Sequence, residues 1–83
     1  MNRAEILEKL KEVLLFADES KRAEINSCTE ASNLATDLGL ASVGMLYVVI
    51  AVEETFHIRF ENVGLADFVT VGDVVSYIEG KLS

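Results

Sequence analysis

A run of ten almost wholly apolar residues, Val43 to Val52, lies in the middle of this 83-residue chain and strongly limits its possible folds. The run is too short to cross a bilayer, since a membrane-spanning helix needs about 20 apolar residues. It is therefore expected in a protein core. Its many β-branched residues make a buried strand a competing interpretation. Its length and the closing pair Glu53-Glu54 favour a helix, which we expect from about Ser42 to Phe56.

Two further segments have the periodicity of amphipathic helices, one over residues 3–17 and one that begins at Thr70. The string Thr70-Val71-Gly72-Asp73 resembles a capping box, in which a hydroxyl and a carboxylate bond to unpaired backbone N–H groups. The apolar stripe of the first helix is Ile6, Leu10, Val13, Leu14 and Ala17. That of the central helix is Met45, Val48, Val49, Val52 and Phe56, and that of the last is Val71, Val74, Val75 and Ile78.

The segments between these helices are interpreted as loops and turns. Residues 18–33 are polar and rich in Ser, Asn and Thr, which predicts a long loop with Ile25 inserted into the core. Short helical turns are expected at Leu34 to Leu38, ended by Gly39, and near Leu65 to Phe68. The expected fold class is all-α: a single domain over residues 1–83, a small bundle of three main helices plus a short helical turn.

Composition and charge restrict the compartment and the partners. Apolar residues make up 51% of the chain, so a core can form without a metal, and the lone Cys28 cannot form an internal disulfide. The charged N-terminal residues show no signal peptide, and we expect a soluble, cytoplasmic monomer without membrane insertion. The net charge of −7 is concentrated after residue 34. Nucleic acid and anionic membranes are therefore disfavoured as partners, whereas basic protein surfaces are favoured.

The sequence offers no self-contained active site. His57 is the only histidine, which excludes a histidine-based metal cluster, and we expect it to be a surface or capping group. Cys28 has no base near it in the sequence and is interpreted as an incidental free thiol. Glu53 and Glu54 are adjacent, so on a helix they point about 100° apart and do not form a facing acid–base pair.

Ser42, directly before the most apolar segment, has two interpretations. Its hydroxyl can simply cap the central helix by accepting a hydrogen bond from the backbone. The same position suits a covalently attached phosphate, because the N-terminus of a helix favours anions. Since no base stands beside it in the sequence, an outside enzyme would have to attach that phosphate.

The segment LATDLGLASVGMLYVVIAVEETF, residues 34–56, resembles the corresponding segment of acyl carrier proteins. Leu38-Gly39 precede the serine, and the helix that follows it ends in Glu-Glu and Phe, as in that family. The string TVGDVVSYIEGKL, residues 70–82, is similar to the family's closing helix, and the resemblance extends over about residues 3–83. It implies that Ser42 carries 4′-phosphopantetheine, transferred from coenzyme A by a phosphopantetheinyl transferase, normally with Mg²⁺.

The same resemblance implies a non-catalytic carrier whose thiol holds acyl thioesters. The carrier would deliver them to acyl-transferring or condensing enzymes of fatty acid, polyketide or related specialised synthesis. The residues implied in partner recognition are Val43, Tyr47, Glu53 and Glu54. The candidates to line an acyl pocket between the central and last helices are Met45, Val49, Ile50 and Ile58.

Several positions depart from the family pattern. Ala41 replaces the aspartate before the serine, which in the family helps the transferase to dock, and Val43 replaces leucine. Gly44, Tyr47 and Thr55 stand where acidic residues are common, which implies a dedicated transferase and partners that dock with more apolar contact. Two alternatives remain open: an unloaded, carrier-like interaction module, and an aminoacyl or peptidyl carrier.

Overall fold

The computed structural model describes residues 1–17, 19–40, 43–61 and 67–82, with Val43 described by its backbone alone. Within these ranges the fold is all-α, with no strand and a single isolated β-bridge between Asn33 and Thr70. The elements are α1 (Arg3–Ala17), the 3-10 turn η1 (Glu19–Lys21), α2 (Arg22–Ser27), α3 (Val43–Phe56) and α4 (Val71–Leu82). The predicted class, a small all-α bundle with three main helices, is confirmed.

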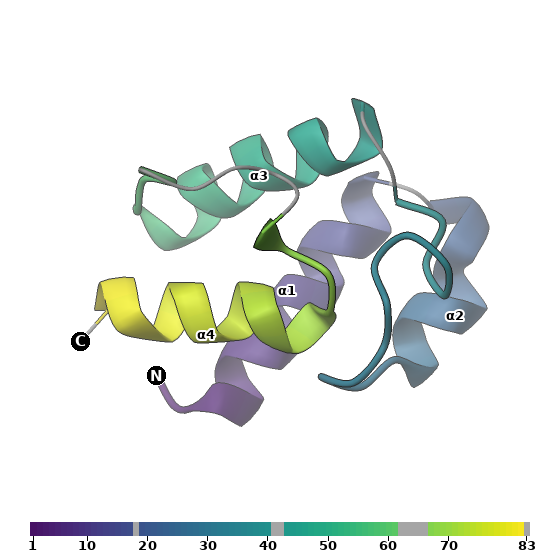
Figure 1. Ribbon diagram of the computed structural model, residues 1–83, viewed down its shortest axis with the longest axis horizontal. Coiled ribbons are helices and arrows are strands. Elements are labelled where there is room, and N and C mark those ends of the chain that lie inside the picture. The colour runs from purple at the N-terminus through teal and green to yellow at the C-terminus, as the bar shows by residue number, and fades with distance from the viewer. Residues whose placement is uncertain (18, 41–42, 62–66, 83) are drawn as a thin grey trace.

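Helix α1 is the element against which the other helices pack. It contacts α2, α3 and α4, and Figure 1 shows it behind α3 and α4, with α2 at the end of the molecule away from the two termini. The predicted stripe of α1 is buried at Ile6, Leu10, Val13 and Leu14. Ala17, the fifth predicted member, is exposed because it is the last residue of the helix, where the chain leaves the core.

The central apolar run is a helix, so the competing strand interpretation is wrong for this segment. Four of the five predicted stripe residues of α3 are buried, and Val49 is half-buried. The helix ends at Phe56 and is followed by His57 with φ of +56°. The N–H of Ile58 donates to the carbonyl oxygen of Glu53 at 3.2 Å. This hydrogen bond is typical of a helix C-terminus that is followed by a residue in the left-handed conformation, here His57.

The long loop predicted over residues 18–33 is wrong at residues 19–27, which form η1 and α2. Ile25 is 1% exposed, which confirms its predicted insertion into the core. A six-residue helix with one core residue has no apolar periodicity to detect. It is too short to be stable alone, so its contacts with α1 must stabilise it. Cys28 follows α2 as a free thiol within the core.

The connection from α2 to α3 is organised by backbone hydrogen bonds and by Asn33. The Asn33 Oδ1 accepts the N–H groups of Ala35 and Thr36, both at 2.9 Å. Residues 34–38 form turns, ended by Gly39 with φ of +68°, a conformation that favours glycine. The second turn, expected near Leu65 to Phe68, lies largely outside the described residues.

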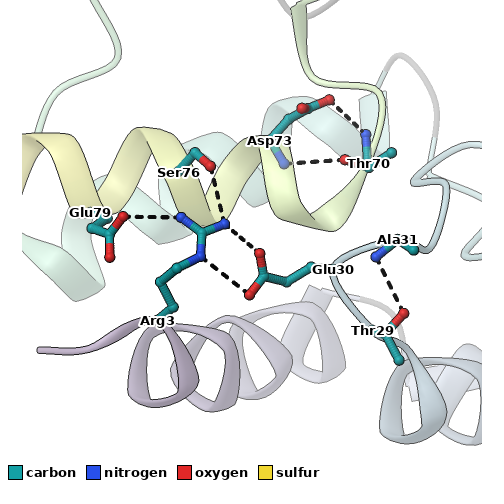
Figure 2. Close-up of polar contacts among 8 residues, drawn as sticks. All are labelled: Arg3, Thr29, Glu30, Ala31, Thr70, Asp73, Ser76 and Glu79. Carbon is teal, nitrogen blue, oxygen red and sulfur yellow. Dashed lines mark hydrogen bonds and ion pairs between the residues drawn. The ribbon is translucent and has the colours of Figure 1, made fainter.

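The predicted capping box of α4 is confirmed. The Thr70 hydroxyl accepts the N–H of Asp73 at 3.2 Å, and the Asp73 carboxylate accepts the N–H of Thr70 at 2.9 Å (Figure 2). The same carboxylate oxygen accepts the N–H of Val69, also at 2.9 Å. These backbone donors lower the pKa of Asp73. The predicted stripe of α4 is buried at all four positions, Val71, Val74, Val75 and Ile78.

A cluster around Arg3 joins the start of α1 to the loop after α2 and to α4. The Arg3 guanidinium forms an ion pair with Glu30 and another with Glu79 at 3.0 Å, and it donates to the Ser76 hydroxyl at 3.1 Å (Figure 2). The two carboxylates raise the pKa of Arg3. Because the paired side chains remain about two-fifths exposed, we assign this cluster to the alignment of the elements more than to stability.

The capping box predicts how stability depends on pH. The pKa of Asp73 is lower in the folded chain than its ordinary value of about 4 in the unfolded chain. Its stabilisation is therefore complete above about pH 4 and is lost as the pH falls through the folded pKa. We expect Asp73→Ala to lower the free energy of unfolding by about 1 kcal/mol at pH 7.

Urea unfolding of the wild type and Asp73→Ala at pH 7 and in acid measures this effect. The difference between the two proteins should shrink in acid, because the wild-type carboxyl group is then protonated. Glu8→Ala is the matched control, since it removes an exposed carboxylate from the middle of α1. A difference that stays constant down to the lowest pH would contradict the assigned role of the carboxylate.

Candidate functional site

Helix α3 has a buried side and an outer side of unusual composition. The buried side contains Met45, Val48, Val52 and Phe56. The outer side carries Leu46, Tyr47 and Ile50, which are 52%, 65% and 49% exposed. The apolar run is therefore buried on one side of the helix only, and its other side presents large apolar side chains to solvent.

The N-terminus of α3 directly follows Ser42, the main candidate functional residue from the sequence. The helix begins at Val43, so Ser42 is the residue immediately before it in the chain, and Ser42 and Ala41 lie outside the described residues. The first turn of α3 contains no acidic residue, whereas those of α1 and α4 contain Glu5 and Asp73. The partial positive charge of this helix end is therefore not offset by a carboxylate of its own first turn. A phosphodiester carried at the start of this helix fits that electrostatic environment.

The residues predicted to recognise partners differ in their solvent exposure and in the hydrogen bonds that they already make. Tyr47 is largely exposed, and Glu54, about two turns further along α3, is also exposed. Glu53 is half-buried, and its Oε2 accepts the N–H of Phe60 at 2.9 Å, so this carboxylate also orders the loop after α3. The side chain of Val43 lies outside the described part of the chain. A role of these four residues in recognition stays a prediction.

The four candidates for an acyl pocket lie in different environments. Met45 is 6% exposed and belongs to the core, and Ile58 packs against that core from the loop after α3. Val49 is half-buried, whereas Ile50 is on the outer side of the helix. Because Met45 and Ile50 are five positions apart, they point about 140° apart around α3. The acyl pocket also stays a prediction.

An aromatic cluster that the sequence analysis missed connects the loop after α3 to α4. The ring of Tyr77 stacks on Phe60 at a centroid distance of 4.8 Å, and Phe68 contacts both rings edge-on. The Tyr77 hydroxyl donates to the carbonyl oxygen of Arg59 at 3.0 Å and accepts the N–H of Glu61 at 2.9 Å. The cluster holds together residues far apart in sequence, and no local pattern marks it.

A shallow groove between α1 and α3 was also missed. It is lined by Phe16, Ala17, Tyr47, Ile50, Ala51 and Glu54. Phe16 is 90% exposed although it is a large apolar residue. The signal was present in the sequence, because Phe16 falls outside the apolar stripe of α1 and therefore had to face solvent or a partner.

The groups most often involved in catalysis are placed in structural roles. His57 is exposed at the C-terminus of α3, which agrees with the predicted surface or capping group. Cys28 is 6% exposed, and burial raises the pKa of its thiol, which disfavours the reactive thiolate. Within the described ranges, no three His, Cys, Asp or Glu side chains converge as metal ligands. In those same ranges no helix has the length and apolarity needed to cross a membrane.

The fold and the site together define a small helical protein with a serine directly before its most apolar helix. Over 84 aligned residues the chain is 37% identical to the acyl carrier protein of Thermotoga maritima, covering 98% of this chain and 96% of that protein. It is 35% identical over 81 residues to the acyl carrier protein of Prochlorococcus marinus, covering 98% of each chain. No protein-family model matches the chain.

The chain belongs to the acyl carrier protein family, as its full-length similarity to these two relatives shows. The resemblance drawn from residues 34–56 and 70–82 is thereby confirmed. Members of this family are carriers and not catalysts, in agreement with the expectation that the chain is not an enzyme.

Proposed function

We propose that the chain is a loaded acyl carrier, with 4′-phosphopantetheine attached to Ser42. The observation that carries the proposal is the position of Ser42 immediately before α3, in a chain related over its whole length to acyl carrier proteins. The absence of acidic residues from the first turn of α3 supports it, because the phosphodiester is anionic. The thiol of the arm holds acyl groups as thioesters and presents them to partner enzymes.

Loading is a phosphoryl-type transfer whose atoms balance without any oxidant or reductant. The Ser42 hydroxyl oxygen attacks the phosphorus of coenzyme A that bears the pantetheine, and a new P–O bond forms. The pyrophosphate bond of coenzyme A breaks, 3′,5′-adenosine bisphosphate leaves, and the hydroxyl proton passes to a base of the transferase. Mg²⁺ bound by the transferase offsets the phosphate charges.

The proposed partners are a phosphopantetheinyl transferase and acyl-transferring or condensing enzymes of fatty acid, polyketide or related synthesis. Because Ala41 replaces the aspartate that helps the transferase of typical family members to dock, we propose a dedicated transferase. Recognition is assigned to α3, through Val43, Tyr47, Glu53 and Glu54. We further propose that residues 1–83 act as one carrier domain in the cytoplasm. The net charge of −7 favours a monomer, because two copies repel each other.

Intact-mass analysis after incubation with coenzyme A, Mg²⁺ and several transferases tests the proposal. We expect a mass gain of one phosphopantetheine group in the wild type and no gain in Ser42→Ala. Ser27→Ala is the matched control, because Ser27 is exposed at the end of α2, where its hydroxyl donates to backbone carbonyls of its own helix. This variant should load like the wild type.

Two results would contradict the proposal. A gain that persists in Ser42→Ala would place the attachment elsewhere. No gain with any transferase would favour the unloaded interaction module, an alternative that the exposed apolar side chains of Leu46, Tyr47 and Ile50 support. If loading occurs, thioester capture with acyl and aminoacyl substrates separates an acyl carrier from an aminoacyl or peptidyl carrier.

A further inference from the structure

The groove between α1 and α3 combines exposed apolar side chains from two helices. The C-terminal end of α1 contributes Phe16 and Ala17, and the facing part of α3 contributes Tyr47, Ile50 and Ala51. An adjoining hollow is lined by Lys9, Glu12 and Val13 of α1 and by Glu54 and Thr55 of α3, so the two helices run antiparallel here. The two hollows share Phe16, Ala51 and Glu54, and we treat them together as one groove. We call this feature the Phe16–Tyr47 groove.

The side chains of this groove are those expected of a protein interface. Phe16 is 90% exposed, Tyr47 65% and Ile50 49%, and they gather around one concavity. Contiguous apolar surface of this kind on a small protein indicates an interaction site. Aromatic rings are enriched in such sites because they bury a large area at a small cost in side-chain entropy.

The charges around the groove indicate what the partner carries. Glu54 lines the groove over its whole described length, and Glu12 lies on the facing helix. Among the described lining residues Lys9 is the one base. The whole chain carries −7, so a second copy meets a surface of its own sign. A partner with Lys or Arg beside its apolar residues is attracted by the same charges, which favours its encounter rate.

We infer that the Phe16–Tyr47 groove binds an amphipathic helix of a partner protein, with an apolar stripe flanked by Lys or Arg. A groove between two antiparallel helices accepts a third helix in the way that helices pack in bundles. The apolar stripe covers Phe16, Tyr47 and Ile50, and a flanking cation pairs with Glu54. This inference deepens the proposed assignment of recognition to α3 and does not require that Ser42 be loaded.

The test is a titration of the ¹⁵N-labelled chain with synthetic 18-residue helical peptides, followed by NMR. One peptide has a leucine stripe flanked by lysines, a second has glutamates in place of the lysines, and a third has the first composition in an order without a stripe. We expect the first peptide to shift the backbone amide signals of residues 16–17 and 47–54 and to bind more tightly than the other two. High salt should weaken that binding.

Variants of the chain decide whether the groove itself is the site. Phe16→Ser and Tyr47→Ser should each weaken binding of the first peptide by about fivefold or more. Val69→Ser is the matched control, since Val69 is 52% exposed outside the groove, and it should bind like the wild type. Because the changed side chains are exposed, thermal melts should show all three variants folded.

Any of four results would overturn the inference: signal shifts spread over the acidic surface, equal losses in Val69→Ser, equal binding of the scrambled or acidic peptide, or dimerisation of the chain through Phe16. Loading of Ser42 is measured on the same samples. Peptide binding at the groove without loading would contradict the proposed carrier function while supporting the groove. Loading without peptide binding would support the carrier function and overturn the inference about the groove.

Discussion

Leu10→Ala should lower the free energy of unfolding by about 3–5 kcal/mol, because Leu10 is fully buried in the middle of α1. Helix α1 packs against α2, α3 and α4, so a cavity there removes contacts that hold these helices together. A chain of this size has a total stability of only about 5–10 kcal/mol. The variant should therefore be close to unfolding at room temperature.

Urea unfolding followed by circular dichroism measures this loss. Leu46→Ala is the matched control: it makes the same chemical change on a helix, at a side chain that is 52% exposed. The control should change the free energy of unfolding by less than about 0.5 kcal/mol. Similar losses in the two variants would mean that α1 is not the centre of the core.

Gly72→Ala and Gly80→Ala should change the stability in opposite directions, although both glycines lie in α4. A Cβ on Gly72 would be 2.9 Å from the backbone oxygen of Glu30 and 3.2 Å from its Cβ. The N–H of Gly72 donates to that same oxygen at 2.8 Å, so the two backbones are in direct contact. We expect Gly72→Ala to cost about 1–3 kcal/mol, since the loop must move away from α4.

A Cβ on Gly80 meets nothing within 4 Å. Alanine is the better helix former there, and Gly80→Ala should stabilise the chain by up to about 1 kcal/mol. For a domain of this size each kcal/mol moves the melting temperature by about 4–8 °C, so thermal melts separate the two variants clearly. A higher melting temperature for Gly72→Ala than for the wild type would contradict the close approach of the two backbones.

The structure also changes how the candidate site is understood. Glu53, chosen from the sequence as a recognition residue, accepts a backbone hydrogen bond from Phe60. Tyr47 is exposed and forms one groove with Phe16 from the other helix. The surface that α3 offers to a partner is therefore more aromatic and less acidic than its Glu-Glu ending suggests.

The sequence by itself determined the three main helices and most of their buried residues. Apolar residues at helical spacing lie on one face of a helix, so their spacing predicts both the helix and its buried side. The capping box involves Thr70 and Asp73, which are close in sequence, so it can also be predicted without a structure. The place of Ser42 before α3 and the order of motifs around it also come from the sequence. These features were enough to indicate the family.

Tertiary structure alone decided the rest, because those features depend on residues far apart in the chain. Helix α2 is stabilised by packing on α1. The contact of Gly72 with Glu30 joins residues 42 positions apart, and the groove forms only because Phe16 lies near Tyr47. A local pattern shows which face of each helix is apolar. It does not show which helices meet, since that depends on how all the faces are buried at once.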